Sequence, residues 1–575
     1  MEFGLIAVAA VVVLVGVSLL SGRIGIAAPL ALVLVGIGIG YIPGVPLIKI
    51  DPEIILLGVL PPILYAAAVN VPLIDFRRNL KPVAGLSVLL VIISALIVGL
   101  LLHLAVPQVP FPAAVALGAV ISPPDAVAAT SIGKRLGLPE RIVSILEGES
   151  LVNDATSLVL LRTALAAVGG GFVFWNAAGS FAYSVVAAIA VGFVMGVITV
   201  WIRSRINNPV YDTLISFVVP FISFIPAEEI GASGVLAVVV TGLYTGHHSG
   251  RHFSAVSRTN ERLNWRTLQF ILENGVFLLM GLQLHELVNE VLGSPFHLGK
   301  ITLIAASLVA LLIICRAIFM VPLIISMRGE EQRSRSRGDS ITRLEARLAR
   351  KGKGLDERAE RRVQLLRQRA QADLEHDLDQ QLGWREGVVL SWSAMRGVVT
   401  LAAAQSIPAE IPYRPQIVLI AFLVAVFTLL LHGLTLPAVI RWLWPEGVKS
   451  GLDRTELAAL GRDLIEAGIE AIDDELSIET EDPDRTITPD ATVQRAKLST
   501  RNAIAPLSID AHPTSSHPTK ETPAAAYMRL TRLALEAQRT ALNEERAIGR
   551  YSSKALRAAE LALDAHESRI SPFKQ

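Results

Sequence analysis

Cysteine is almost absent from the sequence, which holds one, Cys315, among 575 residues. An intramolecular disulfide and a cysteine-based metal centre are therefore excluded, and the apolar run 311–315 indicates that Cys315 is a packing residue. Paired His and Cys residues, a glycine-lysine phosphate loop and a dinucleotide fingerprint are also missing. Nothing in the sequence points to an enzyme, to ATP-driven or redox chemistry, or to a bound cofactor or resident metal.

Charge is also scarce. Charged residues make up 18% of the chain, whereas soluble proteins carry about 25%. The formal net charge of +1 gives no basis for nucleic-acid binding. The charges are segregated, because they gather in residues 328–386 and after residue 445. The remainder of the chain is nearly free of them.

Apolar residues make up 52% of the chain, and the mean hydropathy is +0.52. Segments of about 17–25 apolar residues mark membrane-crossing helices, and about thirteen of them can be counted. The first carries Glu2 where a secretory signal would carry positive charge, so we expect it to be retained as a span. The sequence thus predicts an all-α polytopic membrane domain over residues 1–445, embedded in a lipid bilayer.

Lysine and arginine occupy every second connection between the predicted spans. By the positive-inside rule these connections face the cytoplasm, which places the N-terminus outside and the C-terminus inside. The charged stretch 328–386 then becomes a cytoplasmic loop. Residues 446–575 become a cytoplasmic tail, with helices near 455–475 and 525–566 and a disordered segment over 478–522. The basic residues of these connections are Arg23, Arg77, Arg78, Lys81, Lys134, Arg135, Arg141, Arg203, Arg205, Arg251, Arg258, Arg262 and Arg266.

Ionisable residues inside the predicted spans are the functional candidates, because each costs about 2.5–3.5 kcal/mol at a helix centre on insertion scales. In the sixth span Ser150 and Asp154 are four residues apart and share one helical face with Glu147. Asn153 lies beside that face. Such oxygen donors suit a hard cation. Because burial favours the protonated form of Asp154 and a bound cation favours the charged form, proton and cation compete for one carboxylate.

The fifth span contains Ser122-Pro-Pro-Asp125. Two prolines remove backbone donors, so we expect the helix to break there, with Asp125 at the break and carbonyl groups exposed to cations. In the alternative the helix is only kinked, and Asp125 is a local cap. The twelfth span is weakened at Gly397 and runs in the opposite direction. Interrupted segments in opposed halves indicate an inverted-repeat transporter with its site between two broken, crossing helices.

Arginine inside a span needs a partner. For Arg396 in the twelfth span the expected partner is Glu149, which lies on the sixth span away from the Asp154 face. We expect this ion pair to be structural rather than to handle ions. Arg162, about two turns beyond Asp154, is either an interface residue or the partner of a buried acid. Its role is undecided, and so is that of Glu147.

The segments 122–125, 147–154 and 391–400 together resemble the monovalent cation/proton antiporters of the NhaP and NHE type. The resemblance covers the membrane domain. It implies about thirteen helices, a transport core beside a dimerisation domain, a homodimer and an elevator-like motion.

The resemblance also implies roles for single residues. Asp154 is implied to bind both proton and cation, with Asp125, Ser150 and the backbone carbonyl of Pro124 as further ligands. Asn153 is implied to orient the site, and it stands where electrogenic relatives carry a second aspartate, which implies electroneutral exchange.

Two departures from the family pattern concern the same site. Ala66 follows Tyr65 where many relatives carry a carboxylate, so an accessory acid near Asn153 is missing. Pro124 precedes Asp125, whereas in many relatives the proline follows the aspartate. Proton affinity, the preferred cation and the position of the helix break can therefore differ.

The predicted function is exchange of Na⁺, with Li⁺ as a further substrate, for H⁺ across the cell membrane, serving pH and sodium homeostasis. K⁺/H⁺ exchange by the same fold is the alternative. A cation channel would require a continuous polar lining or repeated filter carbonyls, which the sequence does not contain. A sensor carried by the tail would leave the charges inside the membrane unexplained.

Overall fold

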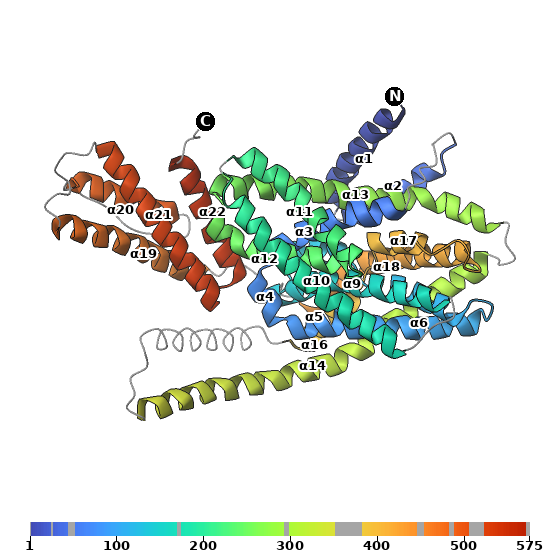
Figure 1. The fold of residues 1–575 in the computed structure, drawn as a ribbon. Coiled ribbons are helices and arrows are strands. Elements are labelled where there is room, and N and C mark those ends of the chain that lie inside the picture. Colours follow the sequence, from blue (N-terminus) through green and yellow to red (C-terminus); the bar gives the residue numbers. More distant parts are fainter. Residues whose placement is uncertain are drawn as a thin grey trace.

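The structure is a computed structural model that describes most of the chain. The described residues are 2–24, 27–43, 52–168, 174–206, 208–292, 298–350, 382–444, 454–481, 488–504 and 523–570. Every regular element within these ranges is a helix (Figure 1). The all-α fold is confirmed.

Figure 1 shows the order of the helices along the chain. Those before the first helix break are α1 (Glu2–Ile24), α2 (Ala28–Gly40), the π-helical segment η1 (Ile54–Val59), α3 (Leu60–Asn70), α4 (Leu73–Arg78), α5 (Leu80–Ala84), the π-helical segment η2 (Gly85–Leu90), α6 (Val91–Ala105) and α7 (Phe111–Ile121). After it come α8 (Ala126–Leu136), α9 (Glu140–Val168), α10 (Phe174–Arg203), α11 (Pro209–Glu229), α12 (Gly234–His252), α13 (Ala255–Leu292) and α14 (Leu298–Arg350). The last are α16 (Trp384–Trp392), α17 (Val398–Gln405), α18 (Arg414–Leu443), α19 (Arg454–Glu481), α20 (Asp490–Ile504), α21 (Pro523–Ile548) and α22 (Ser553–Ile570).

Eight helices within the described ranges are long and apolar enough to cross a membrane. Shorter apolar stretches occur at Val8–Ile24, Ala28–Gly40 and Ile54–Asn70. The polytopic membrane fold is confirmed, whereas the count of about thirteen spans stays a prediction.

Two helices are broken where the sequence predicts it. Helix α7 ends at Ile121 and α8 begins at Ala126, because Pro123 and Pro124 supply no backbone donors. Helix α16 ends at Trp392, and α17 begins only after Gly397. The breaks meet, since the backbone N–H of Asp125 donates to the carbonyl of Met395 at 2.6 Å. A backbone donor of the first break and a backbone acceptor of the second, both left free by the loss of helical hydrogen bonds, are thereby paired.

Helix α9 lies between two apolar cores. Ile145 and Leu146 belong to a core shared with α6, α7, α14 and α18. Leu151 and Ala155 pack instead into a core formed with α3, α10, α11 and α12. The residues around Asp154 therefore sit at the boundary between two packed groups of helices.

Helices α19–α22 form a bundle at one end of the membrane helices (Figure 1). One of its apolar clusters contains Leu460, Leu464, Leu542 and Leu563, all at most 3% exposed. Helices α21 and α22 turn at Gly549, whose φ of 77° suits glycine. The single helix expected over 525–566 is therefore two helices.

The expected disorder over 478–522 is wrong for residues 478–481, which end α19, and for residues 488–504. Helix α20 lies there and buries Val493 and Ala496 against Leu530 and Ala534 of α21. Residues 482–487 and 505–522 of that segment lie outside the described residues. In the same way, residues 328–350 of the charged loop continue α14, and residues 351–381 lie outside the described ranges.

Candidate functional site

A cavity of about 1190 Å³ lies where the broken helix α7/α8 meets α9. Pro124, Asp125, Ser150 and Asp154 line it, so four of the predicted ligands come together. The opposite wall is formed by α13. Asp154 is only 9% exposed, and within the described part of the chain no arginine, lysine or hydrogen-bond donor binds its carboxylate. Proton and cation can therefore compete for Asp154 without displacing a fixed partner.

The break between α7 and α8 is held by the helix that carries Asp154. Asn153, fully buried, donates from Nδ2 to the carbonyl oxygen of Pro124 at 2.7 Å. The backbone N–H of Ala126 lies 3.4 Å from Oγ of Ser150, which accepts from it. Asn153 and Ser150 thus hold the two sides of the break against α9. The contact from Asn153 also engages the Pro124 carbonyl, one of the expected ion ligands.

The Asp125 carboxylate both caps a helix and lines the cavity. Its Oδ1 accepts a hydrogen bond from the backbone N–H of Val127 at 2.8 Å and so caps α8. Its side chain also lines the cavity with Asp154. The local-cap interpretation and the ligand interpretation are therefore compatible, because a carboxylate has two oxygens and accepts several bonds.

Gly397 makes room for that carboxylate. A Cβ built on Gly397 would lie 1.7 Å from Oδ2 of Asp125. We expect Gly397→Ala to displace Asp125 and to lower transport by about two orders of magnitude, the typical effect of misplacing an active group by 1 Å. Initial rates of ion-driven proton movement in liposomes measure this. The control is Gly433→Ala, whose Cβ would meet only Leu30 side-chain atoms at 3.7 Å or more. Equal loss in both variants would contradict the prediction.

The expected ion pair between Glu149 and Arg396 is wrong. Glu149 pairs instead with Arg316 of α14, at 2.5 Å from Nη1 to Oε1 and 2.7 Å from Nη2 to Oε2. Both side chains are at most 3% exposed. Arg316 also donates from Nε to the carbonyl of Leu390 on α16 at 2.8 Å. This bidentate pair therefore ties α9 to two further helices.

Arg396 binds backbone instead of a carboxylate. Its guanidinium donates to the carbonyls of Ile121 at 2.9 Å and Ser122 at 3.3 Å, and also to that of Ala394. The first two end α7, where the helix dipole and free carbonyls favour a cation. Arg396 thus ties one broken helix to the other through backbone carbonyls rather than through an ion pair.

The two undecided residues take part in partly exposed ion pairs, and one of the pairs lines the cavity that contains Asp154. Glu147 accepts from Lys134 of α8 at 2.6 Å. Arg162, whose side chain is 58% exposed, pairs with Glu228 of α11 at 2.6 Å. Glu147 and Glu228 each have a cationic partner and are partly exposed, so neither is an isolated charge in the core.

Sequence reasoning missed Glu273. It lies on α13, lines the same cavity as Asp125 and Asp154, and is 9% exposed. Its Oε1 accepts from Nε2 of Gln269 at 2.7 Å. Ala66, where an acid was expected to be missing, is fully buried. An acid inside the tenth predicted span was the available signal, since every intramembrane carboxylate is a functional candidate.

Known proteins resemble most of the chain. A family described as "Sodium/hydrogen exchanger, transmembrane" matches residues 8–442. An uncharacterized Na⁺/H⁺ exchanger of Mycobacterium tuberculosis is 29% identical over 456 residues, which are 76% of this chain and 74% of that protein. The Na⁺/H⁺ antiporter ApNhaP of Aphanothece halophytica is 29% identical over 416 residues, covering 72% and 68%.

One solved structure has the same fold. It is the sodium proton antiporter MjNhaP1 of Methanocaldococcus jannaschii, with a TM-score of 0.55 and 17% sequence identity, and the match covers 76% of this chain and 98% of that one. The broken helices and the cavity lie within residues 8–442, the part of the chain that the family matches. The chain belongs to the sodium/hydrogen exchanger family.

Proposed function

We propose that this protein exchanges Na⁺ for H⁺ across the cell membrane, with Asp154 as the group that both ions use in turn. The observation that carries the proposal is the buried Asp154 carboxylate, which faces the cavity and has no fixed cationic partner among the described residues. Asp125 and Ser150 line the same cavity and supply further oxygen ligands. Family membership and the names of the relatives support Na⁺ as the cation.

The direct test is proton movement in liposomes that hold the purified full-length chain and a pH-sensitive dye. Addition of Na⁺ is expected to move protons across the membrane faster than the passive proton leak does. Li⁺ is expected to have the same effect. Addition of K⁺ tests K⁺ as the alternative substrate. Protein-free liposomes set the baseline. No response to any of the three cations would overturn the proposal, and a response to K⁺ alone would replace Na⁺ by K⁺.

Electroneutral exchange is the stoichiometry we propose. Asn153 occupies the position next to Asp154 and is engaged with the Pro124 carbonyl, so it adds no second carboxylate there. Asp125 is tied to the backbone of α8. One titrating carboxylate then carries either one proton or one monovalent cation. We expect the initial exchange rate to be unchanged when a membrane potential is imposed with an ionophore. A rate that follows the potential would contradict one-for-one exchange.

The proposed orientation places the C-terminal helices in the cytoplasm and the N-terminus outside, in a multi-pass cell-membrane protein. The support is the lysine and arginine content of alternate connections. We also propose a homodimer, as the family resemblance implies, and a role in pH and sodium homeostasis. Light scattering of the detergent-purified chain measures its oligomeric state.

A further inference from the structure

Helix α12 ends in a group of histidines, His247, His248 and His252. The proposed orientation places this end of the helix on the cytoplasmic side of the membrane. None of the three side chains lines the cavity that contains Asp154, so the exchange of Na⁺ for H⁺ does not use them. Imidazole is the commonest metal ligand among protein side chains. The geometry of the three rings decides which of them can bind a metal ion together.

His248 and His252 lie on one face of the helix, because they are four residues apart. Their ring centroids are 6.0 Å from each other. His252 is exposed and His248 is partly exposed, so a hydrated ion can approach both rings from solvent. The pair therefore has the spacing and the access that a chelating pair of imidazoles requires.

The hydrogen bonds of the two rings determine which nitrogen carries the proton. Nδ1 of His248 lies 2.9 Å from the carbonyl oxygen of Tyr244, and Nδ1 of His252 lies 3.1 Å from that of His248. A carbonyl oxygen only accepts, so Nδ1 is the donor in each ring, and Nε2 of the neutral imidazole keeps its lone pair. Metal-binding histidines typically bond their second ring nitrogen to a carbonyl or a carboxylate in this way. Both rings thus present Nε2 for coordination.

A neighbouring aromatic ring fixes one member of the pair. The His248 ring stacks on the Tyr244 ring with centroids 4.1 Å apart and an interplanar angle of 26°. Tyr244 in turn contacts Phe193 of α10 at 5.3 Å. A ring held like this loses little freedom when it binds. A metal ion about 2.0–2.1 Å from both Nε2 atoms requires ring centroids about 5 Å apart, and the exposed His252 side chain can rotate to close the difference of about 1 Å.

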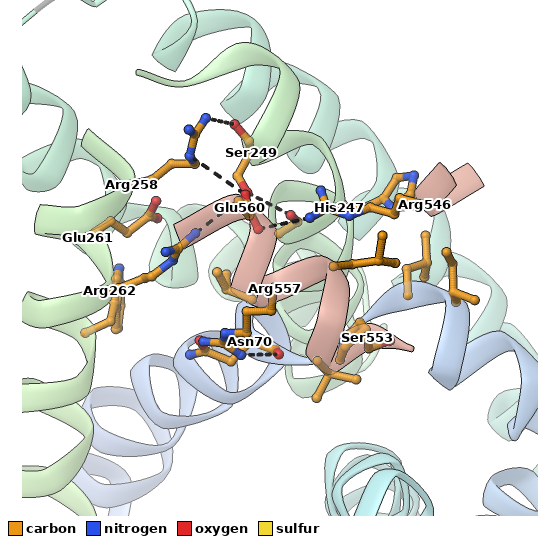
Figure 2. Close-up of a pocket in the computed structure, with 18 residues that line it drawn as sticks. Asn70, His247, Ser249, Arg258, Glu261, Arg262, Arg546, Ser553, Arg557 and Glu560 are labelled. Carbon is orange, nitrogen blue, oxygen red and sulfur yellow. Dashed lines mark hydrogen bonds and ion pairs between the residues drawn. The ribbon is translucent and has the colours of Figure 1, made fainter. Parts of the chain in front are cut away.

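His247 lies in a different environment. It lines the pocket that is drawn in Figure 2, beside Arg546, whose guanidinium repels a metal cation. Within the described ranges, no group of three or more His, Cys, Asp and Glu side chains is arranged to hold a metal ion. An ion at the end of α12 therefore has two protein ligands, His248 and His252, and completes its coordination with water.

We propose that His248 and His252 form a binding site for a divalent transition-metal ion. Imidazole nitrogens suit Zn²⁺, Ni²⁺ and Cu²⁺, whereas Mg²⁺ and Ca²⁺ prefer oxygen ligands. The site is separate from the one that exchanges Na⁺ and H⁺, because neither histidine lines the cavity. A bound ion bridges the last turn of α12, and it stabilises the folded chain because it binds the folded form.

Titration calorimetry with Zn²⁺ tests the site in the full-length chain, which is purified without a polyhistidine tag and freed of metal with a chelator. We expect one Zn²⁺ per chain and no heat of binding with Mg²⁺. His248→Phe keeps a ring for Tyr244 to stack on and removes both nitrogens, and His252→Ala removes the exposed ligand. Each variant is expected to bind Zn²⁺ at least about ten-fold more weakly, since loss of a ligand costs no less than loss of the group that orients it.

The matched control is His247→Ala, which removes the adjacent histidine and is expected to bind Zn²⁺ as the parental chain does. Equal melting temperatures of the variants in chelator, and parental Na⁺/H⁺ exchange, show that they are folded. Pulsed electron paramagnetic resonance with one equivalent of Cu²⁺ counts the bound imidazole rings, and we expect two in the parental chain. No Zn²⁺ binding by the parental chain, unchanged binding in His248→Phe and His252→Ala, or an equal loss in His247→Ala would overturn the proposal.

Discussion

Asp154→Asn is expected to reduce cation-driven proton movement to the level of protein-free liposomes. Asparagine has almost the same size, but it can neither release a proton at neutral pH nor neutralise a bound cation. The substitution therefore removes the competition between the two ions and leaves the shape of the cavity. Dye-reported exchange with Na⁺, Li⁺ and K⁺ over a range of pH measures the effect.

The matched control for Asp154→Asn is Glu228→Gln, which removes a carboxylate that pairs with the exposed Arg162 and does not line the cavity. This variant is expected to transport at close to the parental rate. Both variants should elute as single species from size-exclusion chromatography, so that loss of folding is not mistaken for loss of function. Full exchange by Asp154→Asn would remove Asp154 from the mechanism.

Arg316→Met is expected to destabilise the protein by about 3–5 kcal/mol, because it leaves Glu149 charged, buried and unpaired. Glu149 is 1% exposed, so water cannot replace the lost guanidinium. Loss of the bond from Arg316 to the Leu390 carbonyl adds an unsatisfied acceptor. Denaturant or thermal unfolding in detergent, followed by the fluorescence of the tryptophans, measures the change.

An exposed ion pair provides the comparison. Arg162→Met breaks a pair whose arginine is 58% exposed, and it should cost about 0–1 kcal/mol. The double variant Glu149→Gln/Arg316→Met removes both buried charges and should recover part of the loss. If Arg316→Met and Arg162→Met had equal effects, the assignment of Arg316 as the partner of Glu149 would be wrong.

The arrangement of the candidate site residues was predictable from sequence where it depends on local rules. Helical spacing placed Ser150 and Asp154 on one face, and Pro123 and Pro124 placed the first break. The second break, at Gly397, followed from a weak helical sequence. Each of these predictions depends only on residues a few positions apart along the chain, where backbone geometry decides the outcome.

The partner of Glu149 was not predictable in the same way. Arg316 and Arg396 are both arginines inside apolar segments, and the choice between them depends on how α14 and α16 pack against α9. The same dependence on packing between distant segments explains why the helix α20 was not predicted. Its polar composition resembles a disordered segment, yet it is ordered because the neighbouring helices α19 and α21 cover its apolar face.

Arg396, which binds the carbonyls at the end of α7, contributes to the net charge of the buried groups at the two breaks. Among the described buried groups at the two breaks, Asp125, Asp154 and Glu149 are acids, and Arg316 and Arg396 are bases. With these five ionised and with Glu273, the acid on the α13 wall of the cavity, protonated, one negative charge remains, and a single proton or a single Na⁺ on Asp154 cancels it. The loaded site is then neutral in either form, whereas the empty site is an anion that a low-dielectric barrier holds back. Under the proposed mechanism, coupling follows from this balance, because only an occupied site crosses the low-dielectric barrier at low cost and neither ion is then expected to leak alone.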